Sequence, residues 1–216
     1  MKMRILTLLA LCLALAAVPA MAQTLYTNGP YNGTTDGWTI NFGFVVSDTL
    51  PAFSAGSTIT GADFEMWLIE GDTLETAQLS ITSGENGGTS YFNQTVSFTQ
   101  SGCSLNQYSY DVCAESAAFN VAAPTSASWI NLQNAVTADG EPVYWDENSG
   151  PSSASESEVG TIPSEAFTIL GTTGTSSTSS TSTTSTTNTS VPEPSSIMLF
   201  GSGILGLAGM LRRKLF

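Results

Sequence analysis

The amino-acid sequence predicts an all-β fold between residues 23 and 171, an antiparallel two-sheet sandwich of the jelly-roll type. Short runs of alternating apolar and polar residues recur through this part of the chain. Clusters of Gly, Asn, Asp and Ser separate these runs, as expected for turns. No window outside the two chain ends has the 3.6-residue periodicity of an amphipathic helix. About nine short strands in about 150 residues favour one domain that buries its own core.

Two runs give the clearest strand patterns. Residues 38–46 alternate strictly from Trp38 to Val46, and residues 59–69 alternate between an apolar and a more polar face. In the second run the apolar face carries Phe64, Met66 and Leu68, and the opposite face carries Asp63, Glu65 and Trp67. Shorter strands are expected at residues 77–81, 91–98, 108–112, 119–121, 129–136, 142–145 and 166–170. Turns are expected at residues 70–72, 84–88, 139–141 and 148–153.

The distribution of charge excludes several classes of function. The 5 Lys and Arg residues lie only at the two chain ends, the 18 Asp and Glu residues lie between them, and the chain has no His. Nucleic-acid binding and phosphoryl transfer both require cationic side chains, so neither is expected. A nucleophilic Ser or Cys would lack a His or Lys base. The acidity is interpreted as a means of remaining soluble outside the cell, with calcium binding or cation bridging as the alternative.

Residues 1–22 have the three parts of a secretory signal peptide. Lys2 and Arg4 form a basic start, an apolar segment follows, and Ala20 and Ala22 form an A-x-A cleavage site. Cleavage by signal peptidase would make Gln23 the first residue of the exported protein.

Residues 191–216 have the features of a membrane-sorting tail. Pro192, Glu193 and Pro194 precede the uncharged segment 195–211, which would span roughly 25 Å as a transmembrane helix. A basic cluster then follows, formed by Arg212, Arg213 and Lys214. Basic residues stay on the cytoplasmic side, so the remainder of the chain would lie outside the membrane.

This order of motif, apolar helix and basic cluster over residues 191–214 resembles the PEP-CTERM sorting signal. The resemblance implies recognition by an exosortase, a membrane protease that processes its substrates near the Pro-Glu-Pro motif. It also implies a Gram-negative bacterium and placement at the cell surface or in an extracellular polysaccharide matrix. It implies nothing about the chemistry of residues 23–171, because very different proteins share this tail.

Residues 172–190 predict a disordered linker, because all of them are Ser or Thr except Gly174 and Asn188. Its hydroxyl groups are plausible sites of O-glycosylation, with a bare flexible linker as the alternative. Cys103 and Cys113 are the two cysteines that remain after signal cleavage. Export to an oxidising compartment predicts a disulfide between them.

Two groups of residues are candidate ligand sites. Tyr144, Trp145 and Asp146 would suit stacking on a sugar ring with recognition of its hydroxyl groups, although aromatic residues that fill the core are the favoured interpretation. Loop oxygens could hold Ca²⁺, although solvated loop charges are favoured because no EF-hand spacing is present. These oxygens would come from Asp139, Glu141, Asp146, Glu147 and Asn148. No cofactor is otherwise predicted.

The sequence therefore predicts a non-enzymatic protein of the cell surface or matrix, tethered in the inner membrane before an exosortase processes it, with extracellular polysaccharide as an expected partner. The alternative is a lectin-like carbohydrate-binding module that uses Ca²⁺. A glycan-active hydrolase is a third hypothesis, because a glycosidase needs only two carboxyl groups, but the sequence singles out no pair.

Overall fold

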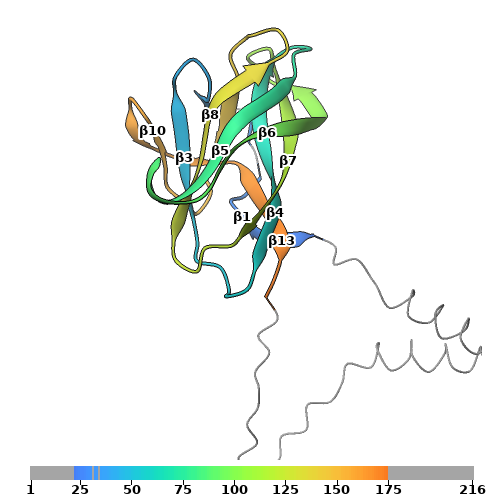
Figure 1. Cartoon of the computed structure of the whole chain (residues 1–216). Coiled ribbons are helices and arrows are strands. Elements are labelled where there is room, and N and C mark those ends of the chain that lie inside the picture. Colours follow the sequence, from blue (N-terminus) through green and yellow to red (C-terminus); the bar gives the residue numbers. More distant parts are fainter. Residues whose placement is uncertain (1–21, 31, 34, 175–216) are drawn as a thin grey trace, which may run out of the picture. The chain divides into compact units, whose positions relative to one another are not determined.

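The computed structural model describes residues 22–30, 32–33 and 35–174, and this part of the chain consists of strands and loops without a helix (Figure 1). The strands are β1 (Gln23–Thr27), β2 (Gly37–Thr39), β3 (Val45–Leu50), β4 (Thr58–Ile69), β5 (Leu74–Gly84), β6 (Gly87–Leu105), β7 (Tyr110–Ala122), β8 (Ser128–Thr137), β9 (Tyr144–Asn148), β10 (Ala154–Glu156), β11 (Gly160–Ile162), β12 (Ser164–Glu165) and β13 (Phe167–Thr172). The predicted signal peptide, most of the Ser/Thr linker and the sorting tail lie outside the described residues. The expectation of an all-β fold is confirmed.

The strands form a single 13-stranded sheet with antiparallel pairing. Its main path runs in the order β1-β13-β4-β7-β6-β5-β8-β3-β10-β11. β9 lies off this path and pairs with β2, β12 and β4. Figure 1 shows this sheet curled on itself.

β6 joins the two halves of the sheet. Its first part pairs with β5 as far as Ser97, opposite Thr76, and from Phe98 onward it pairs with β7. A 19-residue strand accumulates a large right-handed twist, which carries the sheet from one half to the other. The expected division into two separate sheets is therefore not confirmed.

The core lies between the two halves of the curled sheet. Phe64, Met66 and Leu68 of β4 are fully buried and belong to the same cluster as Leu79 of β5 and Leu132 of β8. The predicted alternation of β4 is therefore confirmed, since its apolar positions face this core.

The predicted continuous strand at residues 38–46 is wrong. β2 ends at Thr39 and β3 begins at Val45, with a turn between them in which the Phe44 N–H donates to the Asn41 carbonyl at 3.1 Å. Phe42 and Gly43 both have positive φ, of 56° and 95°, and glycine adopts such a conformation at low cost. Phe42 is 65% exposed, so its place in an alternating pattern misled the prediction.

Other boundaries also differ from the prediction. Residues 110–112 and 119–121 of two expected strands belong to the single strand β7, and Tyr108 and Ser109 lie in the turn before it. The short strands β1, β10, β11 and β12 were not expected, because their Ser-, Thr- and Glu-containing sequences resemble loops. They become strands because pairing with adjacent strands satisfies their backbone groups.

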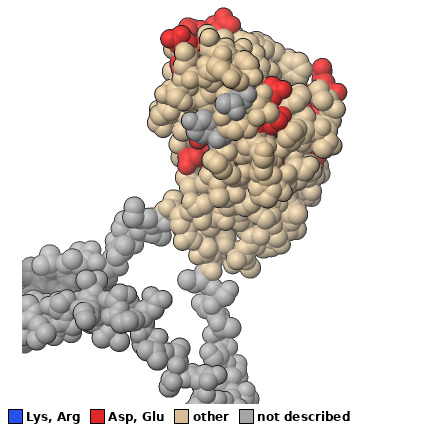
Figure 2. All heavy atoms as spheres, turned by 180° about the vertical axis from the view of Figure 1, so that it is seen from behind, with Lys and Arg blue, Asp and Glu red and all other residues tan. Residues whose placement is uncertain are grey.

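The two ends of the described chain lie side by side. β1 pairs with β13, with Gln23 opposite Gly171, and the Gln23 side chain donates to the Thr173 hydroxyl at 3.1 Å. Figure 2 shows that on one face the acidic side chains gather on the half of the molecule away from these ends.

Candidate functional site

Four aromatic side chains meet on the outer face of the sheet, and we call them the aromatic cluster: Trp67, Tyr108, Tyr110 and Tyr144. The ring centroids of Trp67 and Tyr110 lie 6.0 Å apart, and those of Tyr110 and Tyr144 lie 5.5 Å apart. Tyr108, in the turn between β6 and β7, stacks on Trp67 at 5.8 Å with an interplanar angle of 25°. Trp67 is 5% exposed and Tyr108 is 51% exposed. Tyr108 thus presents aromatic surface to solvent, and Trp67 supports it from beneath.

The cluster borders a small pocket of about 160 Å³. It is lined by Asp36, Gly37, Trp67, Tyr110 and Tyr144. A Cβ atom on Gly37 would lie 2.9 Å from the Tyr144 Cβ atom and 3.5 Å from the Trp67 ring. Glycine is therefore needed for β2 to approach β9 this closely and for the pocket to stay open.

Asp146 fixes the position of the Trp67 ring. The Trp67 indole N–H donates to Asp146 Oδ1 at 2.5 Å. The backbone N–H groups of Gly33 and Asn32 donate to the same carboxylate, each at 3.0 Å. Burial raises the pKa of Asp146, and these three hydrogen bonds oppose the effect of burial because they favour the ionised form. Asp146 therefore links the loop before β2 to the aromatic cluster.

The tyrosine hydroxyl groups supply polar contacts beside the aromatic surface. Burial and a hydrogen bond to Tyr110 raise the pKa of Tyr144 to about 12, so this hydroxyl keeps its proton at physiological pH. A neutral hydroxyl both donates and accepts hydrogen bonds, whereas the Asp36 carboxylate at the pocket only accepts. The pocket thus combines apolar ring faces with both kinds of polar group.

A second hollow of about 590 Å³, which we call the β4 groove, lies at the other end of β4. Its lining includes Gly61 and Asp63 of β4, Ser116 of β7 and Thr99 of β6, and the Ser116 hydroxyl donates to Asp63 Oδ1 at 2.7 Å. Gly61 and Trp67 are about 20 Å apart along the strand at ~3.3 Å per residue. An extended ligand of that length could contact both the groove and the aromatic cluster.

Glu65 lies between the two hollows in the sequence of β4, on the same face as Asp63 and Trp67. Burial and the charges of Asp146 and Asp63 raise the pKa of Glu65 to about 7. Part of the Glu65 population is therefore protonated at neutral pH and can donate a hydrogen bond.

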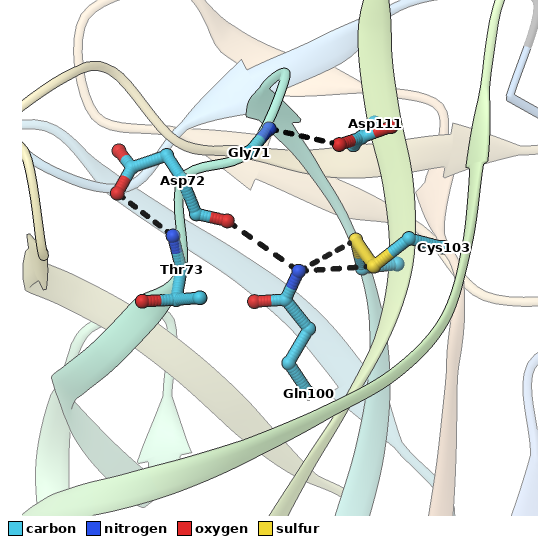
Figure 3. Close-up of a disulfide and its surroundings, with 7 residues drawn as sticks. Gly71, Asp72, Thr73, Gln100, Cys103 and Asp111 are labelled. Carbon is cyan, nitrogen blue, oxygen red and sulfur yellow. Dashed lines mark hydrogen bonds between the residues drawn. A yellow bond between two sulfur atoms is a disulfide. The ribbon is translucent and has the colours of Figure 1, made fainter.

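A disulfide holds the hairpin that carries Tyr108. Cys103 and Cys113 are bonded across β6 and β7, which confirms the predicted disulfide (Figure 3). The Gln100 side-chain nitrogen donates to both sulfur atoms, at 2.9 and 3.1 Å. Beyond the disulfide, Asn106 Oδ1 accepts from the Tyr108 and Tyr110 N–H groups at 2.9 and 3.0 Å. The turn is thus fixed at its base and at its tip.

The structure separates the three residues predicted to form a sugar site. Tyr144 lines the pocket, but Trp145 is fully buried, contacts the rings of Phe64 and Phe167, and is not available to a ligand. Asp146 is also fully buried, and its hydrogen bonds lie within the protein. Successive strand residues face opposite sides of a sheet, which is why Trp145 and its neighbours cannot all face one ligand.

The acidic loop residues predicted as an alternative calcium site do not form one together. Asp139 and Glu141 are exposed, whereas Asp146, Glu147 and Asn148 are buried in β9. Within residues 22–30, 32–33 and 35–174, no group of three or more His, Cys, Asp or Glu side chains is arranged as a closed metal site.

Sequence reasoning did not assign Trp67, Tyr108, Tyr110 or Asp36 to a site. One signal was present, because Trp67 falls on the more polar face of an alternating strand. A large aromatic residue at such a position must either be covered by other side chains or contact a ligand. Its partners Tyr110 and Tyr144 are distant in sequence and meet it through the pairing of β4 with β7 and β9.

Comparison with protein families matches residues 190–214 to the PEP-CTERM protein-sorting motif. The predicted sorting motif is therefore confirmed, and it marks the chain as an exported protein that is anchored in the membrane and then processed by an exosortase. Comparison with curated proteins and with solved structures yields no match. The predicted residues of the motif and the helix 195–211 lie outside the described residues. In the part of the chain that the structure describes, no helix has the length and apolar character needed to cross a membrane.

Proposed function

We propose that this protein is a non-enzymatic component of the cell surface or extracellular matrix that binds extracellular polysaccharide through its aromatic cluster. The observation that carries the proposal is the outward-facing stack of Tyr108 on Trp67, beside the pocket of Asp36, Tyr110 and Tyr144. Sugar rings have apolar faces that pack on aromatic rings, and their hydroxyl groups require hydrogen-bond donors and acceptors nearby. The aromatic cluster and its pocket offer both.

The size of the pocket beside the aromatic cluster favours a chain over a single small molecule. The pocket of about 160 Å³ is smaller than the ~300 Å³ or more of pockets that enclose drug-sized ligands. It would hold one ring or one end group, and the β4 groove on the same face would contact further units. A neutral polysaccharide is favoured, because the described residues contain no Lys, Arg or His to bind acidic sugars.

The arrangement of the strands also suits a surface protein. The last strand, β13, ends at Thr172, which pairs with Thr58 at the start of β4, whereas Trp67 lies near the other end of β4. The aromatic cluster is therefore separated from the point at which the chain continues into its sorting tail.

The test is retention of the full chain on polysaccharide prepared from its own host, with Tyr108→Ala compared with the wild type. Tyr108 is half exposed, so its removal should weaken retention by about 10-fold or more with little loss of stability. Tyr91→Ala is the matched control, because Tyr91 is 37% exposed and lies on the part of β6 that pairs with β5. Equal retention of both variants and the wild type would refute the aromatic cluster as the binding site.

A glycan hydrolase is the second candidate, and Glu65 is the observation that favours it. A carboxyl group with a pKa of about 7 beside a second carboxyl group, Asp63, fits a general acid with its partner. Incubation with the same polysaccharide decides between the two. The leading proposal predicts no release of reducing ends, whereas release that Glu65→Gln abolishes would establish the enzyme.

A further inference from the structure

Two buried carboxyl groups of the described residues have no hydrogen-bond partner. Glu115 of β7 and Glu165 of β12 are both fully buried, and neither side-chain oxygen of either residue accepts a hydrogen bond. Such groups are rare, because the water that is lost on burial is then not replaced. The neighbour of Glu115 on β6, Gln100, also has a buried side-chain oxygen without a partner, its Oε1 atom. This coincidence points to an interaction between Glu115 and Gln100.

The two side chains lie on the same face of the sheet. Gln100 and Glu115 are direct cross-strand partners in the pairing of β6 with β7. The Cβ atoms of such partners are about 4.5–5.5 Å apart, and their side chains point to the same side. Glu115 also pairs with Phe64 of β4, which belongs to the core, so this side is the inward face. Three buried oxygen atoms that lack a donor therefore share one part of the core.

The orientation of the Gln100 amide group is set by its other contacts (Figure 3). Its Nε2 atom donates to the two sulfur atoms of the disulfide at 2.9 and 3.1 Å, and to the Asp72 carbonyl at 3.4 Å. None of these three atoms carries a hydrogen, so an oxygen in the place of Nε2 would lose all three contacts. The amide nitrogen therefore faces the disulfide, and the amide oxygen needs a donor from elsewhere.

We infer that Glu115 is a neutral carboxylic acid in the folded protein and that its hydroxyl group donates a hydrogen bond to Gln100 Oε1. A protonated carboxyl group has one O–H donor, and an amide oxygen is an acceptor. A single proton thus gives a partner to both side chains. It also removes the charge that would otherwise be buried without compensation.

The charges around Glu115 favour this proton. Burial and the charge of Glu65 on β4 raise the pKa of Glu115 to about 8. On β6 its partner Gln100 is neutral, and the disulfide does not titrate. Asp72, in the turn that Gln100 contacts, accepts from the N–H groups of its own turn and of Asp139, at 2.7 and 3.1 Å. The described residues contain no Lys, Arg or His that could pair with an ionised Glu115.

The hydrogen bond gives the Gln100 amide group two alternative orientations. With Glu115 neutral, the amide joins the turn after β4 to the disulfide at the base of the hairpin that carries Tyr108. An ionised Glu115 would need an N–H donor, so the amide would turn its nitrogen toward Glu115 and leave the disulfide and the Asp72 carbonyl. Because the pKa of Glu115 is about 8, this change falls at mildly alkaline pH.

The test follows the side-chain NH₂ group of Gln100 by ¹⁵N NMR in the full chain in detergent, with the signals assigned through the bonds of the residue. In the wild type these signals should shift between about pH 6 and pH 9, with a midpoint near the pKa of about 8 of Glu115. In Glu115→Gln they should stay constant, because the new amide donates to Oε1 and does not titrate. Glu65→Gln is the matched control: it should keep the shift and lower its midpoint, because one negative charge is removed.

A second variant tests the hydrogen bond from the side of Glu115. Gln100→Met removes the acceptor, which destabilises only the neutral form, so it should lower the pKa of Glu115 by about 1. The ¹³C signal of the Glu115 carboxyl carbon measures this change. An unchanged pKa of Glu115 in Gln100→Met would overturn the hydrogen bond. Gln100 signals that ignore pH in the wild type, or that shift equally in Glu115→Gln, would overturn it as well, and the wild-type result requires no variant to fold.

Discussion

β4 turns Phe64, Met66 and Leu68 into the core and Asp63, Glu65 and Trp67 to its opposite face. Trp67 and the neighbouring Trp145 belong to opposite faces of the sheet, although both are buried, with 5% and 0% of their surface exposed. The Trp145 indole donates to the Ala166 carbonyl at 2.9 Å among core rings, whereas the Trp67 indole donates to a carboxylate beneath an exposed tyrosine. Burial alone does not distinguish a core residue from a site residue, whereas the face of the strand on which the residue lies does distinguish them.

The inward face should control stability most strongly. Phe64 is fully buried between the rings of Phe98 and Trp145, at centroid distances of 6.0 and 5.4 Å. Phe64→Ala should lower the free energy of unfolding by about 3–5 kcal/mol, because it leaves a cavity in the core. Denaturant unfolding measures this loss, and Asp63→Asn on the outward face should change it by less than about 1 kcal/mol. Similar losses in both variants would contradict the proposed difference between the faces.

A carboxyl group on the inward face should make stability depend on pH. Glu115 lies opposite Phe64 on β7, and burial and the charge of Glu65 raise its pKa from 4.5 to about 8. The folded state then holds a proton that the unfolded state loses, so stability falls as pH rises from about 5 to 8. Glu115→Gln should remove this part of the dependence and stabilise the protein at pH 8 by on the order of 3 kcal/mol.

Melting curves between pH 5 and pH 8 measure this effect. Glu70→Gln, on the exposed turn after β4, is the control for removal of one negative charge. An unchanged pH dependence in Glu115→Gln would mean that Glu115 is ionised in the folded protein.

The outward face should depend on the disulfide for its geometry. Replacing Cys103 and Cys113 together by Ser should cost about 2–3 kcal/mol of stability, because the unfolded chain loses a short cross-linked loop. The turn that carries Tyr108 should also become mobile, so polysaccharide retention should weaken even at temperatures where the variant is fully folded. Retention equal to that of the wild type would show that the hairpin does not position Tyr108.

Local patterns in the sequence were sufficient for some of these features. Alternation identified the two faces of β4, cysteine content and export identified the disulfide, and the spacing of charges in the tail identified the sorting motif. These features depend on residues close together in the chain. The turn at Phe42 was missed because an exposed aromatic residue gives the same alternation as a buried one.

The candidate site depended on contacts that local patterns do not contain. Tyr110 and Tyr144 reach Trp67 only because β7 and β9 both pair with the end of β4. Glu165 lies in a short polar segment that resembles a loop, and its burial follows from pairing with β9 and from the Asp48 side chain that accepts its N–H. The aromatic cluster and the burial of Glu165 both depend on strands that pair across long distances in the sequence. Sequence reasoning could therefore not predict which residues would meet.

The pairing of β13 with β4 also determines how the protein would respond to a pulling force. The strands are antiparallel, Thr172 lies opposite Thr58, and Trp67 is near the far end of β4. A load applied at a ligand on Trp67 and at the chain after Thr172 would therefore pull the two strands along their length in opposite directions. The ladder bonds are perpendicular to the strands, so they would share this load together and would not open one at a time. If polysaccharide binds at the aromatic cluster as proposed, tension between it and the chain after Thr172 would load the β4–β13 ladder in shear.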